Sequence, residues 1–466
     1  MYEQRRFPRL AWIPIAAGVL WVWAAAPHHF LTLLATLPIG GSLLASGVAL
    51  LLWPGDYRIT QTLALGAALG VLGALPMMLV AGFWTGLALA VLSALSLLVS
   101  GAAAVYQEPW LPGVPKPEPS VRLSAMVAAD EIVLGMEQFS VGLPIGHDGR
   151  RLVREIQDAR ALFRERGWLD EPETYHAAPP PLVQPRIRVA HTAGIAFEHL
   201  SYPSEYEPRP EEPGRERWLG YGPNRTGHAW LLRHRDGERP WLICSNGFRT
   251  GFPHIDVRLF RHYHEALGLN VLMPVLPLHG PRRVGRISGD GFLSGEVVDT
   301  VHAVAQAIWD LRRLISWVRL EGAPVIGTLG LSLGGFTTAL LAGVEDRLAT
   351  AIAGIPVADL PRLFWRHAPK LQLEYLRHLE LDPDVLAELM RPVSPLTVAP
   401  RVPHAGRMIF GGISDRLVPP DHIRDLAEHW EHPRTVWYQG GHLTFGRDPR
   451  VQSAVDATLA EAKLAR

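Results

Sequence analysis

Three side chains that together perform nucleophilic catalysis occur in this chain, each within a short motif. Ser332 lies in residues 330–334 (GLSLG), Asp415 follows the run MIFGGIS that begins at residue 408, and His442 ends the run VWYQGGH. A serine hydroxyl is a weak nucleophile at neutral pH, so it needs a neutral imidazole to remove its proton and a carboxylate to orient that imidazole. The sequence therefore predicts Ser332 as nucleophile, His442 as base and Asp415 as the orienting acid.

Each of these residues also has an ordinary structural explanation. Ser332 could sit in a tight packing turn, and His442 could be a histidine at a strand end. Asp415 could cap the helix that starts after residues 418–420 (VPP), in which case Asp359, which follows the preceding strand, is the alternative acid. The order Ser, Asp, His along the chain favours the catalytic interpretation.

The elements that would position these residues are strands and helices in alternation. The apolar run before Ser332 stops at two flanking glycines and passes into a helix-compatible segment, as a strand, a sharp turn and a helix require. Further strands are predicted at 197–202, 228–234, 241–245, 271–276, 351–356, 407–411 and 435–438. Helices are predicted at 255–267, 299–320, 335–343 and 449–464, and an insertion at 360–400. This pattern predicts an α/β fold with a mainly parallel sheet flanked by helices.

Residues 186–466 resemble the alpha/beta-hydrolase superfamily in these motifs and in their order. The resemblance implies a serine esterase or lipase-like hydrolase with an oxyanion hole made of two backbone N–H groups. One would be that of Leu333, directly after the serine. The other would be that of Phe248, because Asn246-Gly247-Phe248 takes the place of the commoner His-Gly-X segment.

A second loop, residues 274–283 (PVLPLHGPRR), resembles the Pro-Leu-His-Gly segment of hydrolases associated with membrane lipids. With Asn246, its residues His279, Arg282 and Arg283 are candidates for substrate binding, the arginines for a phosphate or carboxylate. The alternative is a proline-shaped loop whose arginines face water. Apolar side chains of the insertion could line an acyl pocket or simply pack the insertion as a lid.

The first hundred residues have the composition of membrane helices. Asp56 and Arg58 are the only formal charges between residues 10 and 106, and four spans are predicted at 10–26, 30–53, 60–83 and 85–106. Arg5, Arg6 and Arg9 precede the first span, so an even number of spans would leave the catalytic part in the cytoplasm, at the inner or plasma membrane. The helices could serve as an anchor or line a lipid path.

Between the spans and the catalytic part, two proline-rich linkers (109–119 and 177–185) enclose two predicted helices, 122–139 and 149–168. The second helix is rich in arginine, which could contact anionic headgroups or form a solvated face with its own acids. The predicted organisation is a transmembrane region (1–108), a juxtamembrane region (109–185) and a catalytic domain (186–466).

Composition narrows the function further. Lys plus Arg and Asp plus Glu number 45 each, so nothing favours a nucleic-acid partner. The single cysteine, Cys244, excludes an intramolecular disulfide and fits a buried strand. The predicted protein is a membrane-anchored serine hydrolase of carboxylic or lipid esters that needs no cofactor or metal. The alternatives are a peptidase or amidase of the same fold and an inactive hydrolase-like binding or scaffold module.

Overall fold

The computed structural model describes residues 9–28, 30–53, 55–137, 142–143 and 145–465, which form two compact units. Unit 1 comprises Met1–Ser140, Gly411–Asp421 and Trp437–Asp448, and unit 2 comprises Val141–Phe410, His422–Val436 and Pro449–Arg466. The predicted organisation follows chain order, whereas both units are built from segments that are distant in the sequence. The two segments that carry Asp415 and His442 belong to the same unit as the N-terminal helices.

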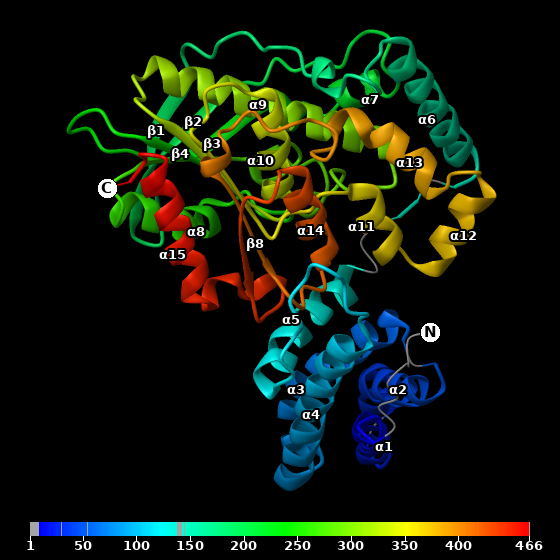
Figure 1. The fold of residues 1–466 in the computed structure, drawn as a ribbon. Helices are drawn as coiled ribbons and strands as arrows, with labels where there is room; N and C mark the ends of the chain where they lie inside the picture. Colours follow the sequence, from blue (N-terminus) through cyan, green and yellow to red (C-terminus); the bar gives the residue numbers. More distant parts are fainter. Residues whose placement is uncertain (1–8, 29, 54, 138–141, 144, 466) are drawn as a thin grey trace. The chain divides into compact units, whose positions relative to one another are not determined.

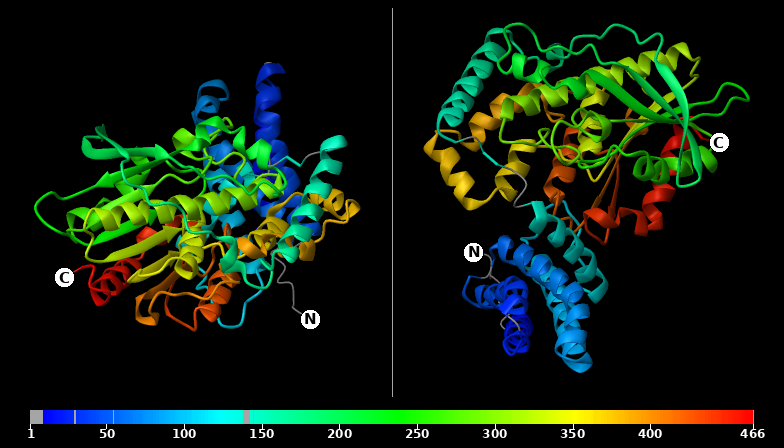
Figure 2. Two further views of the ribbon diagram at one scale, coloured as in Figure 1. Left: turned by 90° about the horizontal axis from the view of Figure 1, so that it is seen from above. Right: turned by 180° about the vertical axis from the view of Figure 1, so that it is seen from behind.

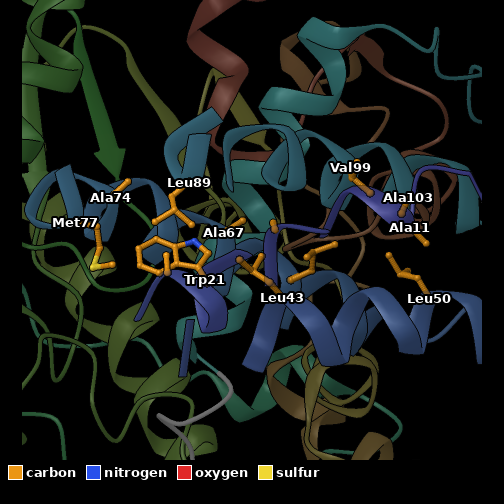
Figure 3. Packing of buried hydrophobic residues seen from close by; sticks show 13 residues of the cluster. Ala11, Trp21, Leu43, Leu50, Ala67, Ala74, Met77, Leu89, Val99 and Ala103 are labelled. Atoms are coloured by element: carbon orange, nitrogen blue, oxygen red, sulfur yellow. The ribbon is translucent and has the colours of Figure 1, made fainter. Parts of the chain in front are cut away.

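Among its described residues, the N-terminal segment of unit 1 forms five α-helices: α1 (Trp12–Ala25), α2 (Phe30–Leu52), α3 (Tyr57–Val80), α4 (Phe83–Gln107) and α5 (Val121–Glu137). Figure 3 shows the buried side chains between α1 and α4, with the Trp21 ring among side chains from the other helices. Trp21 is fully buried, and its indole N–H donates a hydrogen bond to Ser93 Oγ at 3.1 Å. This bond satisfies the one polar group of a ring that otherwise fills the apolar interior.

Three helices among the described residues, α2, α3 and α4, are long and apolar enough to cross a membrane. Of the four predicted spans, the second, third and fourth therefore correspond to helices that are long enough to cross a membrane. Helix α1 has only 14 residues, which at 1.5 Å each is about 21 Å, less than the roughly 30 Å of a hydrocarbon core. Of the three arginines that precede it, Arg5 and Arg6 lie outside the described residues, and Arg9 is exposed.

Unit 1 also holds the two segments from the C-terminal half. Their backbones are joined by hydrogen bonds from Ile413 N to Tyr438 O (3.0 Å) and from Ser414 N to Gly440 O (3.1 Å). The short helix η6 (His442–Arg447) begins at the predicted base. Of the predicted helix 122–139, α5 accounts for all but its last two residues, which lie outside the described residues.

Within the described ranges, nine strands form one sheet in the order β1-β2-β3-β5-β4-β6-β7-β8-β9. They are β1 (Arg186–Thr192), β2 (Ile195–Pro203), β3 (Thr226–Leu232), β4 (Trp241–Ser245), β5 (Asn270–Pro274), β6 (Ile326–Leu331), β7 (Thr350–Gly354), β8 (Arg407–Gly412) and β9 (Arg434–Tyr438). The strands from β5 to β8 pair in parallel, and β1, β2 and β3 run antiparallel to their neighbours. The predicted mainly parallel sheet is confirmed, with β1 as an additional edge strand.

Helices cover both faces of this sheet, as Figures 1 and 2 allow the reader to follow. Trp241 of β4 packs edge-on against Trp317 of α9 (Val297–Leu320), with 5.7 Å between ring centroids. Met408 of β8 lies on the opposite face, because side chains alternate along each strand, and it contacts Thr458 of α15 (Pro449–Glu461). Three further helices alternate with the strands along the chain: α8 (Pro253–Glu265), α10 (Leu333–Val344) and α14 (Pro420–His429).

Two groups of helices lie outside this αβ pattern. The insertion between β7 and β8 folds into α11 (Leu360–His367), α12 (Lys370–His378) and α13 (Pro383–Met390), at the predicted position. Helix α6 (His147–Glu165) and the short α7 (Arg215–Leu219) precede the parallel strands. Three arginines of α6 are paired with acids on other elements of unit 2: Arg151 with Glu296, and Arg160 and Arg164 with Glu388. These pairs tie α6 to unit 2.

Candidate active site

Ser332 lies at the junction of β6 and α10 in unit 2, with φ 57° and ψ −115°. A non-glycine residue in this region is strained by roughly 1–3 kcal/mol, and such strain tends to occur at functional sites. Backbone hydrogen bonds hold the turn on both sides, from Ser332 N to Gly354 O and from Phe336 N to Ser332 O, each 2.9 Å. The side chain is half-buried. Strand, strained serine and helix together form the sharp turn that the sequence predicts.

The glycines around Ser332 are required by close packing. A Cβ atom at Gly334 would overlap the carbonyl oxygen of Ser245 at the end of β4, and one at Gly330 would overlap the carbonyl oxygen of Gly334. Any side chain at either position would therefore push the turn away from the neighbouring strand. The motif owes its spacing to this geometry.

The loop after β4 passes directly beside the serine. An ideal Cβ atom at Gly247 would lie 3.2 Å from Ser332 Cβ and 3.4 Å from Leu331 O. Leu333 is the first residue of α10, so its N–H has no acceptor within the helix. Phe248 follows Gly247 and is half-buried, with the Arg249 guanidinium 4.6 Å from its ring centroid. Leu333 directly follows the serine, and Phe248 follows the glycine that lies beside it, so both candidate donors belong to the same unit as Ser332.

Asn246 shapes this loop through its side chain. Its Oδ1 accepts a hydrogen bond from Gly247 N at 2.8 Å, and its Nδ2 donates to Asp256 Oδ1 at 2.7 Å. Asp256 also accepts from Trp230 Nε1 at 3.1 Å. Burial raises the pKa of Asp256 to about 6, although the hydrogen bonds from Asn246 and Trp230 oppose the rise. Asn246 therefore holds the loop, and Asp256 holds Asn246.

The predicted acid and base are in contact with each other inside unit 1. His442 Nδ1 lies 2.7 Å from Asp415 Oδ2, and both side chains are buried. Burial alone lowers the pKa of His442, but the Asp415 carboxylate outweighs it, so the pKa of His442 stands above its ordinary value. The pair has the arrangement in which a carboxylate fixes the tautomer of a catalytic histidine.

The other oxygen of Asp415 shapes a turn and does not cap the following helix, because α14 begins only at Pro420. Asp415 Oδ1 accepts a hydrogen bond from Val418 N at 2.8 Å, which fixes the turn before α14. Asp359, the alternative acid, caps α11 by accepting from Arg362 N at 2.9 Å. One carboxylate can therefore both shape its own turn and orient an imidazole.

The other substrate-binding candidates have different surroundings. Arg282 is fully buried, pairs with Asp310 at 2.8 Å and donates to the carbonyl oxygen of Val275, so its guanidinium supports the loop. Arg283 is exposed. His279 is 1% exposed, its Nδ1 donates to Pro277 O at 2.8 Å, and burial lowers its pKa to about 4. Two roles were expected for Arg282, binding a substrate or facing water. It has neither, because its guanidinium is buried and paired within the protein.

His279 supports the candidate oxyanion loop from behind. Its ring packs edge-on against Phe248, with 5.8 Å between centroids. Its low pKa keeps it neutral at physiological pH, so it packs as an uncharged aromatic group. The loop of residues 274–283 thus contributes packing to the site in unit 2.

A cavity of about 190 Å³ lies in unit 2 between the start of α10 and the insertion, lined by Phe336, Leu360, Pro361, Met390 and Leu396 among others. It is smaller than the roughly 300–1,000 Å³ typical of ligand pockets. The apolar residues expected to line an acyl pocket divide: Leu373 and Leu376 are buried, and Leu371 is 78% exposed. Within the described ranges, no group of three His, Cys, Asp or Glu side chains is arranged to hold a metal ion.

One residue with a clear role at the base had no motif to reveal it. Asp130 of α5 accepts hydrogen bonds from the backbone N–H of His442 at 2.7 Å and of Leu443 at 3.2 Å. The signal in the sequence is a pair of acids, Asp130 and Glu131, in the middle of a largely apolar helix. Such a pair is also typical of an exposed helix face, so it gives no direction on its own.

No protein-family model matches the chain. It is 40% identical over 358 residues to the uncharacterized protein Rv2627c of Mycobacterium tuberculosis (strain ATCC 25618 / H37Rv), and the match covers 75% of this chain and 85% of the relative. The uncharacterized protein MT2702 of Mycobacterium tuberculosis (strain CDC 1551 / Oshkosh) matches with the same identity and coverage.

Solved structures with a similar chain course include esterases and a peptidase. The acetyl xylan esterase of Paenibacillus sp. R4 has a TM-score of 0.44 at 13% identity, covering 72% of this chain and 99% of its own. The Pyrococcus furiosus esterase Pf2001 has a TM-score of 0.38 at 17% identity, and the match covers 61% of this chain and 98% of the esterase. The Pyrococcus horikoshii acylaminoacyl peptidase has a TM-score of 0.36 at 14% identity, and the match covers 58% of this chain and 39% of the peptidase. These scores are too low to transfer an activity or a substrate.

Proposed function

The chain belongs to the same family as Rv2627c of Mycobacterium tuberculosis, and we propose that it is a serine hydrolase that cleaves carboxylic esters. The observation that carries this proposal is the conformation of Ser332, a strained serine between β6 and α10. A serine that merely packs in a turn gains nothing from such backbone angles, whereas a nucleophile gains an exposed hydroxyl at the end of a strand.

In the proposed reaction, His442 takes the proton of Ser332 Oγ while that oxygen attacks the ester carbonyl. The N–H groups of Leu333 and Phe248 stabilise the negative charge that develops on the carbonyl oxygen. Collapse of the tetrahedral intermediate breaks the bond to the alcohol, which receives the proton from His442, and leaves an acyl group on Ser332. A water molecule, deprotonated by His442, then releases the carboxylic acid and restores the serine.

Asp415 supports this proton transfer in two ways. Its hydrogen bond to Nδ1 leaves Nε2 of His442 as the nitrogen that accepts the proton. Its negative charge also stabilises the imidazolium that forms in each half of the reaction. The raised pKa of His442 is the equilibrium expression of the same attraction.

We further propose that the substrate is a membrane-associated ester and that α2, α3 and α4 keep the enzyme at the bilayer. The proposed orientation has the catalytic residues in the cytoplasm. If only α2, α3 and α4 cross the membrane, this orientation requires the residues before α2 to lie outside the cytoplasm. If Arg9 lies in the cytoplasm, the same orientation requires α1 to cross as a fourth span.

The test is hydrolysis by the detergent-solubilised full chain. Short-chain and long-chain acyl esters are compared with aminoacyl amides of matched acyl groups. We expect turnover of esters that is lost in Ser332→Ala. Cleavage restricted to amides would identify a peptidase, and absence of any Ser332-dependent turnover would favour a binding module.

A further inference from the structure

Asp130 connects the helices of unit 1 to both segments that carry the acid–base pair. Its side chain is fully buried on α5 and accepts hydrogen bonds from His442 N (2.7 Å), Leu443 N (3.2 Å) and Arg416 N (3.2 Å). Arg416 directly follows Asp415, so a single carboxylate binds the backbone next to both members of the pair. These bonds fix where each loop lies relative to α5.

The loop before the histidine is shaped to admit this carboxylate. A Cβ atom at Gly441 would overlap the Asp130 carboxylate, so residue 441 must be glycine for α5 to approach. The second glycine of the Gly-Gly-His motif is thereby explained by a residue more than three hundred positions away in the sequence. Sequence and packing agree that Asp130 and the His442 loop are fitted to each other.

Glu131, the next residue of α5, holds the side chain of Arg416. Its Oε1 accepts from Arg416 Nε at 2.7 Å, and its Oε2 accepts from Thr60 Oγ1 of α3 at 2.7 Å. Glu108, directly after α4, also pairs with the Arg416 guanidinium. Arg416, the residue next to Asp415, is therefore linked to α3 through Glu131 of α5 and directly to Glu108 after α4, all within unit 1.

Burying the Asp130 carboxylate costs free energy, which calls for a functional reason. The pKa of Asp130 is raised to about 7, chiefly by burial and next by the charge of Asp415, while His442 and the backbone N–H groups oppose the rise. Replacing buried charged networks by apolar side chains is often neutral or stabilising, so stability alone does not account for a carboxylate here. A carboxylate beside a histidine that must become an imidazolium does account for it, because the imidazolium charge favours the ionised form of Asp130.

We propose that Asp130 is a positioning residue for the His442–Asp415 pair, and that α5 makes the N-terminal helices a working part of the acid–base apparatus. This inference rests on the proposed function. Asp130 acts through the backbone of residues 416, 442 and 443, and through its charge on the imidazole. The helical unit is then required for turnover as well as for attachment.

The charged and titratable groups around this pair come from each element packed on it. They are Asp130 and Glu131 of α5, Glu108 after α4, Asp415 and Arg416 of the acid turn, and Tyr438 and Asp448 of the base segment. Asp130 adds its charge to that of Asp415, and both raise the pKa of His442. Removing the charge of Asp130 should therefore lower the pKa of His442.

The test is Asp130→Asn in the full-length protein, assayed on the ester that the wild type turns over. We expect kcat to fall about 10- to 100-fold with KM within about twofold, because the base is displaced and substrate binding is not. The acid limb of the rate against pH should move to lower pH. Asp299→Asn is the matched control, because Asp299 is an equally buried helical acid, paired with Arg217 in unit 2. It should leave the acid limb in place.

A purely structural role for Asp130 would lower the thermal midpoint and leave kcat and the pH profile of the folded fraction unchanged, and that result would overturn the inference. If Asp130→Asn does not fold, Gly441→Ala takes its place, since it separates the loop from Asp130 with every charge retained. It should lower kcat, and unchanged kcat there would equally overturn the inference. A wild type without Ser332-dependent turnover would instead refute the proposed function itself.

Discussion

Nδ1 of His442 lies 2.7 Å from Oδ2 of Asp415, although 27 residues separate them in the chain. Both residues follow strands, and the segments after β8 and β9 are joined by the hydrogen bond from Ser414 N to Gly440 O. The contact is therefore held by backbone structure and does not depend on the side chains alone. It gives His442 the tautomer that a general base for Ser332 needs.

Replacing the acid tests this relationship. Asp415→Asn should lower kcat on the order of 10⁴-fold, because the imidazole loses both its orientation and the charge that stabilises its protonated form. His442 acts as base only when neutral, so activity falls as pH falls through its raised pKa. Loss of the carboxylate lowers that pKa, and the acid limb of kcat/KM should move to lower pH. An unmoved acid limb would contradict the assignment of Asp415.

The loop beside the serine gives a steric prediction. Gly247→Ala places a Cβ atom 3.2 Å from Ser332 Cβ, so the loop must shift by a few tenths of an ångström. Misplacing one oxyanion donor should lower kcat by up to about 10²-fold. Gly222→Ala is the control, because a Cβ atom there meets nothing within 4 Å. Equal kcat in the two variants would show that the loop containing Gly247 does not contribute to the active site.

Arg282 should matter for stability and little for substrate binding. Arg282→Met leaves the buried Asp310 carboxylate without its cation and should cost about 3–5 kcal/mol in the free energy of unfolding. Arg283→Ala, at an exposed position, should change stability by less than about 0.5 kcal/mol. Denaturant unfolding measures both. A large rise in KM for a folded Arg282 variant would restore this residue to the substrate site.

Asp256 predicts a pH dependence of stability. Its pKa rises from 3.8 to about 6 on folding, so between these values the folded protein binds a proton that the unfolded chain releases. Its contribution therefore favours the folded state at low pH and is lost as pH rises through about 6. The change is on the order of 3 kcal/mol. Asp256→Asn should lose this part of the stability profile; a profile identical to the wild type would contradict it.

The membrane orientation is tested with reporter fusions after residue 466 in a bacterial host. A fluorescent protein should fold and emit, and alkaline phosphatase should stay inactive, if the catalytic part faces the cytoplasm. With Arg9 on the cytoplasmic side, the opposite pair of results would mean that α2, α3 and α4 cross the membrane and α1 does not, and it would contradict the proposed orientation.

Motifs with local geometry could be predicted from the sequence, and contacts made over long sequence distances could not. The turn at Ser332 and the meeting of Asp415 with His442 follow from glycines, strand ends and chain order. Strand β1 was not predicted, because Ile187 and Val189 alternate with arginines over only four residues at the edge of the sheet. The role of Asp130 depends on α5 reaching the His442 loop, which no spacing reveals.

The structure also differs from the prediction in the surroundings of several arginines and in the length of α1. Arg282 was expected at a substrate or in water, but its partner Asp310 lies 28 positions further along the chain and is brought to it only by the fold. The arginines of α6 likewise find their acids on other elements of unit 2. Helix α1 ends at Ala25, one residue before the predicted end, and starts two residues later, which makes it too short for a clear span.

The most direct test of the central claim is to map the residue that reacts with a fluorophosphonate. The full-length protein is labelled, digested and analysed by peptide mass spectrometry, with Ser332→Ala and heat-denatured wild type as controls. The account predicts a stoichiometric adduct on Ser332 that is absent from both controls. An adduct on another residue, or labelling that persists in Ser332→Ala, would contradict it.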